Sequence, residues 1–297
     1  MIKFNLSFDL FNSYYYIYER LIVLLFSLVP SILLVIFVLY TDRKSKEPKK
    51  NIILCLLSGI LTVSVAAYFE ELVMPYFANN YILTYVFAFI EEFAKMAIFF
   101  LFIFDNKHYD DIYDGIVYMA LIALSFAGLE NIMYAFSEST VSQSISLALM
   151  RDFTTIPLHV ICGVVIGHYL AISTFCKDKT KKVLNIVYAF LISTLIHGTF
   201  NNLMSLLSEV NNKSTLSIFL FQTMPLVLIM ISLFLVAFIY SRKTIILNDM
   251  YYDNNYNYKY DYLMTHEEYL NSYVRKKRLK LSEKIKFYKF KNKKGEK

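Results

Sequence analysis

Seven long apolar stretches dominate the chain and limit its fold more than any other feature. A helix needs about 20 apolar residues to cross the hydrocarbon core of a bilayer. Lipid tolerates neither exposed irregular backbone nor open sheet edges. The sequence therefore predicts an all-α, polytopic membrane helical bundle with about seven transmembrane helices. The stretches are 21–40, 52–74, 81–104, 112–136, 145–173, 183–207 and 216–240.

Basic residues alternate along the chain and predict an orientation. The segment 41–50 holds five lysines and arginines, the segment 177–182 holds four lysines, and the end of the chain is again basic. The intervening connections 75–80, 137–144 and 208–215 hold one basic residue between them. Because cytoplasmic loops are enriched in Lys and Arg, we expect an N-terminus outside and a cytoplasmic C-terminus. Low glycine, no tryptophan and abundant Ile, Lys and Asn are typical of a bacterial protein, so we expect a multi-pass bacterial cell-membrane protein.

A change of composition near residue 243 predicts two parts. Residues 1–243 would form the seven-span membrane domain, and residues 244–297 a polar and basic cytoplasmic tail that is disordered or lies on the membrane surface. The net charge of +6 comes mainly from the cytoplasmic loops and this tail. Anionic lipid headgroups are therefore the expected electrostatic partner, and nucleic acid is not.

Charged and polar residues interrupt four of the apolar stretches. A charged side chain near the bilayer centre costs about 2.5–3.5 kcal/mol on insertion, so these groups must pair or face a polar cavity. At about 1.5 Å per residue, they fall in one layer in the outer half of the bilayer. They are Glu91, Glu92 and Lys95 in the third stretch, Glu130 and Asn131 in the fourth, Arg151, Asp152 and His159 in the fifth, and His197 and Asn201 in the sixth.

Such a set of residues can activate water. A carboxylate can take a proton from water, a histidine can assist, and His and Asn can donate hydrogen bonds to a developing oxyanion. Each group also has a structural interpretation: Glu91 and Lys95 can pair at i,i+4, and His197 and Asn201 can join helices. Glu70 and Glu71 lie close to the outer interface, where solvation accounts for them.

Ordered motifs across residues 35–205 resemble those of the PrsW family of membrane proteases. The segment 91–95 resembles its E-E-x-x-K motif, and 126–131 its F-x-x-x-E-N motif. Arg151 followed by Pro157 and His159 resembles the third motif, and 197–201 the H-x-x-x-N/D motif. The segment 42–48 resembles the D-R-x-x-x-E-P loop, and 113–118 also resembles the family.

The resemblance implies hydrolysis of peptide bonds in a membrane protein, without cofactor or metal. It places the chain with the CAAX prenyl proteases and bacteriocin-immunity proteins in a glutamic-type clan. The implied substrate is a single-pass anti-sigma factor, cut on its outer side in the first step of a signalling cascade. The implied catalytic residues are Glu91, Glu92, His159, His197 and Glu130, and the supporting residues are Lys95, Asn131, Arg151 and Asn201. Glu91 is the preferred base and Glu92 its competitor.

Three alternatives remain open from the sequence. Two histidines and two glutamates could hold zinc in a membrane metalloprotease, although no H-E-x-x-H helix is present. The same buried carboxylates could relay protons in a proton- or ion-coupled carrier. A protease-like scaffold could also act only as a binding partner.

Overall fold

The computed structural model describes residues 10–42, 46–77, 80–209, 224–253, 263, 264, 268 and 271. Within these residues the chain is helical, with one isolated bridge between Cys176 and Leu263. The elements are α1 (Leu10–Thr41), α2 (Lys49–Val73), the short helix η1 (Met74–Tyr76), α3 (Asn80–Phe102), α4 (Asp114–Ser137), α5 (Val141–Phe153), α6 (Thr155–Phe175), α7 (Lys179–Glu209) and α9 (Met224–Asp253).

Each predicted apolar stretch coincides or overlaps with a helix, and the predicted helical membrane bundle is confirmed. Five segments of the described residues are long and apolar enough to cross a bilayer. They are Ile17–Thr41, Lys49–Tyr76, Asp114–Ser137, Val141–Phe175 and Lys179–Leu206. Helix α3 has similar length but carries three charged residues in its middle, and α9 follows residues that lie outside the described part.

The fifth stretch is divided into two helices, α5 and α6, at Thr154. Pro157 accounts for the division, because a proline ring clashes with the carbonyl group four residues earlier, here that of Phe153. The last residue of α5 is Phe153, and Pro157 lies in the first turn of α6, where its missing N–H is tolerated. His159 therefore lies near the start of a new helix, which aims it independently of α5.

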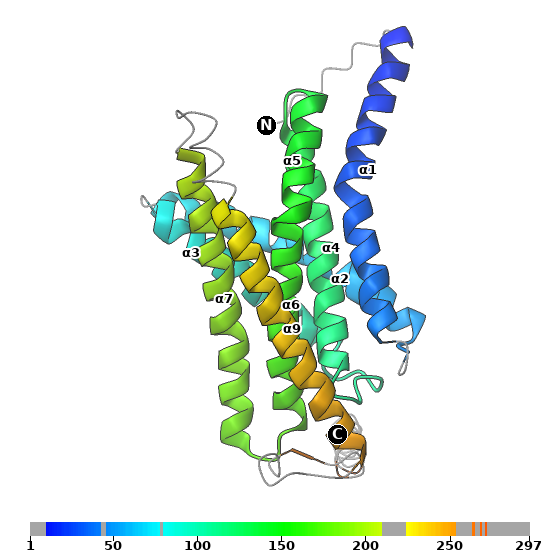
Figure 1. The fold of residues 1–297 in the computed structure, drawn as a ribbon, viewed down its shortest axis with the longest axis vertical. Coiled ribbons are helices and arrows are strands. Elements are labelled where there is room, and N and C mark those ends of the chain that lie inside the picture. The colour runs from blue at the N-terminus through cyan, green and yellow to red at the C-terminus, as the bar shows by residue number, and fades with distance from the viewer. Residues whose placement is uncertain are drawn as a thin grey trace, which may run out of the picture.

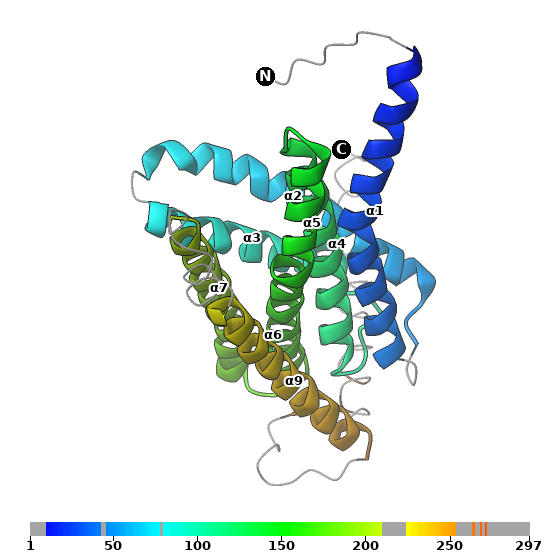
Figure 2. The same ribbon diagram turned by 45° about the horizontal axis from the view of Figure 1, so that its top comes forward.

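Helix α4 lies at the centre of the bundle and packs against α1, α2, α5 and α6. Figures 1 and 2 show α1, α4 and α6 along the long axis, while α2 and α3 cross them obliquely. Helices α4 and α6 approach each other closely at the glycines of α6. A Cβ on Gly163 would lie 2.9 Å from both the Ala123 Cβ and the Met119 carbonyl oxygen of α4. The contact between α4 and α6 thus depends on a residue without a side chain.

Asp42 and Glu47 of the loop motif belong to a polar network at one end of α4. The Tyr118 hydroxyl donates to Glu47, and the Asn51 amide donates to the Tyr118 oxygen over 3.0 Å. Burial, together with the neighbouring Glu47 and Asp111, raises the pKa of Asp42 to about 7. This network joins the start of α2 to the start of α4, and it lies at the opposite end of α4 from Glu130.

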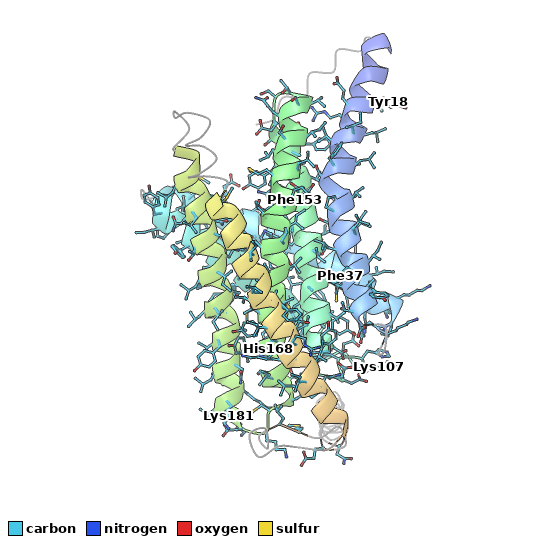
Figure 3. The ribbon with its side chains drawn as sticks, viewed as in Figure 1. Tyr18, Phe37, Lys107, Phe153, His168 and Lys181 are labelled. Carbon is cyan, nitrogen blue, oxygen red and sulfur yellow. The ribbon has the colours of Figure 1, made fainter. Side chains whose placement is uncertain are left out.

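The connections predicted to be cytoplasmic gather at one end of the molecule. Figure 3 shows Lys107 and Lys181 near this end and Tyr18 at the other. Part of the tail lies here as well: the Met264 amide donates to the Phe175 carbonyl oxygen over 2.7 Å, and Glu268 pairs with Lys177. Most of the tail lies outside the described residues, and α9 is continuous through position 243. The domain division and the side of the membrane that this end faces stay predictions.

Candidate functional site

The structure brings side chains from five helices into one buried cluster. Its members are Glu91, Glu92 and Lys95 of α3, Glu130 of α4, Arg151 of α5, His159 of α6 and His197 of α7. All are buried except Glu130, whose side chain is 16% exposed. Helical spacing explains how α3 contributes three of them: Lys95 follows Glu92 by three residues and Glu91 by four, so both carboxylates can reach it.

Lys95 lies at the centre of the cluster. Its Nζ atom lies 2.8 Å from Glu92 Oε1, 3.0 Å from His159 Nδ1 and 3.5 Å from Glu91 Oε2. The ammonium group also lies 4.1 Å from the centre of the Phe126 ring, which provides a cation–π contact. A fully buried ammonium group is tolerated because it is surrounded by acceptors and negative charge.

The contacts of His159 define its tautomer. An ammonium group can only donate, so His159 Nδ1 accepts from Lys95 and the ring proton is on Nε2. That Nε2–H donates to Glu130 Oε2 over 3.1 Å. The same oxygen accepts from Arg151 Nη2 over 2.8 Å, and the Arg151 guanidinium group stacks 4.1 Å from the Tyr134 ring. Glu130 is thus held by one permanent cation and one imidazole.

His197 joins the two adjacent glutamates. Its Nδ1–H donates to Glu92 Oε1 over 2.8 Å, which leaves Nε2 4.0 Å from Glu91 Oε2. Glu91 Oε2 is buried and makes no hydrogen bond within the described part of the chain. Two groups that can both accept, at this separation, suit a water molecule that donates to each of them.

A cleft of about 270 Å³ opens between α2 and α4 beside the cluster. Glu91 and Glu130 line it, whereas Glu92 is fully buried behind them. The remaining lining residues are Val63, Ala66, Ala67, Glu70, Phe126, Met133, Tyr134 and Ser137. The two adjacent carboxylates therefore differ in access: Glu91 faces the cleft, and Glu92 supports Lys95 and His197.

The structure also shows where three other residues from the sequence analysis lie: Asn131, Asn201 and Glu70. The Asn131 amide donates to the Ser27 carbonyl oxygen and to Asp152, so it joins α4 to α1 and α5 and does not face the cluster. Asn201 is half-buried one turn after His197, and its side chain makes no hydrogen bond within the described residues. Glu70, attributed to solvation, lines the cleft. Its spacing of seven, four and three residues from Val63, Ala66 and Ala67 was the available signal.

The comparisons with known proteins identify the family of this chain. A family model described as PrsW family intramembrane metalloprotease matches residues 47–237. This chain belongs to the PrsW family. Similar relatives, each named protease PrsW, include one from Clostridioides difficile (29% identical over 61% of this chain and 79% of the relative) and one from Oceanobacillus iheyensis (30% identical over 59% and 79%). No solved structure matches the chain.

Membership of the PrsW family answers part of the functional question. The chain is a multi-pass membrane protein of an intramembrane protease family, which makes it a hydrolase and leaves no need for the carrier alternative. A relative from Bacillus subtilis, 32% identical over 41% of this chain and 53% of that protein, carries the same name. The matched region contains every residue of the cluster.

The family description raises the question of a metal, and the donor set fits one. One donor atom from each of Glu91, Glu92, His159 and His197 lies within 4.8 Å of the other three. Two imidazoles and two carboxylates are suitable ligands for Zn²⁺, which catalytic sites bind through about three protein ligands and water. Lys95 contacts three of these four side chains, so a bound dication would compete with its ammonium group.

Proposed function

We propose that the chain is a glutamic-type intramembrane endopeptidase in which Glu91 activates water. One observation carries this choice: Glu91 is the carboxylate that both lines the cleft and turns towards His197 Nε2 an oxygen that accepts no hydrogen bond within the described residues. Glu92 does not line the cleft, and its Oε1 atom already accepts hydrogen bonds from Lys95 and His197. The proposed base must reach both water and substrate, and only Glu91 of the pair does so.

In the proposed reaction, a water molecule donates one proton towards Glu91 Oε2 and the other towards His197 Nε2. Glu91 takes the first proton as the water oxygen attacks the substrate carbonyl carbon, and a tetrahedral oxyanion forms. Glu91 then delivers this proton to the leaving amide nitrogen as the C–N bond breaks. Glu92 fixes the His197 ring through Nδ1–H, which keeps Nε2 available as an acceptor.

We assign two side chains, those of Arg151 and Asn201, as donors to the oxyanion. Arg151 carries a guanidinium group beside Glu130 at the cleft, and Asn201 has an amide without a side-chain partner in the described structure. Donors of this kind stabilise the transition state because charge develops on the carbonyl oxygen only during the reaction. His159 links Lys95 to Glu130, because its Nδ1 accepts from Lys95 and its Nε2–H donates to Glu130.

A zinc-dependent protease is the second candidate function, and the proximity of the four donor side chains favours it. Glu91, Glu92, His159 and His197 would hold the ion. A bound zinc ion would polarise the carbonyl group and lower the pKa of water. Phenanthroline treatment of the purified protein followed by metal analysis separates the candidates. We expect activity without bound zinc; loss of activity that zinc restores would establish the metalloprotease.

We further propose that the substrate is a single-pass membrane protein of the anti-sigma type, cut in or just beyond the outer half of its transmembrane segment. The cleft supports this position, since it extends from Glu91 towards Ser137, at the end of α4 predicted to face outside. A substrate helix is also easiest to unwind near its end, where fewer hydrogen bonds break. The N-out, C-in orientation is part of this proposal, and so is the relation to the CAAX prenyl proteases and bacteriocin-immunity proteins, on the motifs alone.

The decisive experiment compares the membrane proteomes of cells with the wild-type chain and with Glu91→Gln. An intact single-pass protein should accumulate in the variant, and mass spectrometry of its products in the wild type should give termini in the outer half of the segment. Unchanged membrane proteomes would contradict the proposed activity. Product termini on the cytoplasmic side would contradict the orientation.

A further inference from the structure

The wall of the cleft formed by α2 combines small side chains with one carboxylate. Val63, Ala66, Ala67 and Glu70 follow one another at helical spacing and all line the cleft. Small residues leave room for another polypeptide backbone to approach α2 closely. Glu70 is the last of this row, near the end of α2, so it stands beside the space that a substrate segment would occupy.

Glu70 has no partner of its own within the described part of the chain. It is half-buried, and its carboxylate makes no hydrogen bond or ion pair with any described residue. Its cleft neighbour Glu91 has a buried oxygen, Oε2, that lies 3.5 Å from Lys95 Nζ but accepts no hydrogen bond within the described residues. A water molecule can donate to the Glu91 oxygen. Glu70 still lacks a hydrogen-bond donor or a cation among the residues that the structure describes.

The charges around the cleft do not balance. Four carboxylates, those of Glu70, Glu91, Glu92 and Glu130, stand near two permanent cations. Each cation has a closest partner already: Lys95 lies 2.8 Å from Glu92, and Arg151 lies 2.8 Å from Glu130. Even a protonated His197 would leave negative charge in excess. Excess charge is costly in a membrane, so the open part of the cleft favours a cationic occupant.

We propose that this cleft selects substrates with a basic side chain close to the scissile bond, and that Glu70 is the counter-ion for that side chain. This inference rests on the proposed protease activity and names a feature of its substrate. Lysine and arginine suit the site because their long apolar stems can lie along Val63, Ala66 and Ala67 while the charged end reaches Glu70. Glu70 is a specificity-determining residue in this proposal, and Glu91 performs the chemistry.

The test uses the full-length protein in liposomes and a set of synthetic single-span peptides. The peptides share one apolar core and differ at a single outer position, scanned as Lys, Gln or Glu. We expect wild-type protein to cut the best Lys peptide about tenfold faster than its Gln counterpart, a factor within the range of a charge-assisted hydrogen bond. Glu70→Gln should remove this preference, and Glu70→Lys should transfer it to the Glu peptide.

Glu71→Gln is the matched control, because Glu71 is the adjacent, exposed carboxylate of α2 and lies outside the cleft. It should keep the preference for lysine. Equal cleavage of Lys and Gln peptides by the wild type, or a preference that survives Glu70→Gln, would overturn the inference. Activity that survives Glu91→Gln would instead overturn the proposed function, so the two failures are distinguishable.

Binding provides a readout that does not require cleavage. The chain has no tryptophan, so peptides that carry one tryptophan can be excited selectively. The Glu91→Gln protein should bind the Lys peptide about tenfold more tightly than the Glu70→Gln, Glu91→Gln double variant does, the factor again being that of a charge-assisted hydrogen bond. Equal binding by the two proteins would overturn the proposal.

Discussion

Replacing each of the two adjacent glutamates by glutamine should separate catalysis from stability. Both variants should lose cleavage: Glu91→Gln removes the proposed base, and Glu92→Gln releases the His197 ring that the base works with. General acid–base groups contribute about 10²–10⁴-fold to rate, so we expect losses in this range for Glu91→Gln. Only one of the two substitutions should also weaken the fold.

The contacts of the two carboxylates predict how much stability each variant should lose. Glu92 Oε1 lies 2.8 Å from both Lys95 Nζ and His197 Nδ1, in full burial. Removing one partner of a buried ion pair typically costs about 3–5 kcal/mol. Glu91 lies 3.5 Å from the same lysine, which keeps its closer partner, so we expect a loss of about 1 kcal/mol or less, close to the net contribution of a typical hydrogen bond. At about 2–4 °C per kcal/mol, Glu92→Gln should lower Tm by at least ~6 °C and Glu91→Gln by ~4 °C at most.

Thermal unfolding in detergent can be followed with a fluorogenic thiol reagent, because the three free cysteines, Cys55, Cys162 and Cys176, are all buried. Cleavage of a membrane peptide is measured on the same preparations. The assignment of Glu91 as base and Glu92 as support fails if the pattern is reversed, with Glu91→Gln the less stable protein. It also fails if Glu91→Gln retains near wild-type cleavage.

Three further results are expected. His197→Ala should reduce cleavage by about 10²-fold or more; near wild-type cleavage would remove this residue from the site. Gly167→Leu should lower the free energy of unfolding in detergent by about 1–3 kcal/mol, because any side chain there meets the backbone of Gly115. An unchanged Tm would contradict the close packing of α4 and α6. Reporter fusions after Pro75 and after Lys182 should report opposite sides of the membrane, and the same side for both would refute the predicted topology.

Local sequence determined the class of fold and the composition of the site. Apolar length fixes a membrane helix without reference to any other segment, and Pro157 ends α5 at Phe153 by a clash within four residues. The cost of burying charge required Glu91, Glu92, Lys95 and His197 to find one another. These inferences need only the spacing of residues along the chain and the properties of the bilayer, so the relative positions of the helices do not enter them.

Only the tertiary structure decided which way each side chain faces. Helical spacing separates Glu91 from Glu92 by about 100°, but the positions of α2, α4 and α7 determine that Glu91 faces the cleft and Glu92 faces His197. The same packing turns Asn131 towards α1 and brings Glu70 to the cleft. The sequence specifies which residues share a helical face. Which helix that face contacts depends on how the obliquely placed helices pack. This packing is set by contacts between segments far apart in the chain.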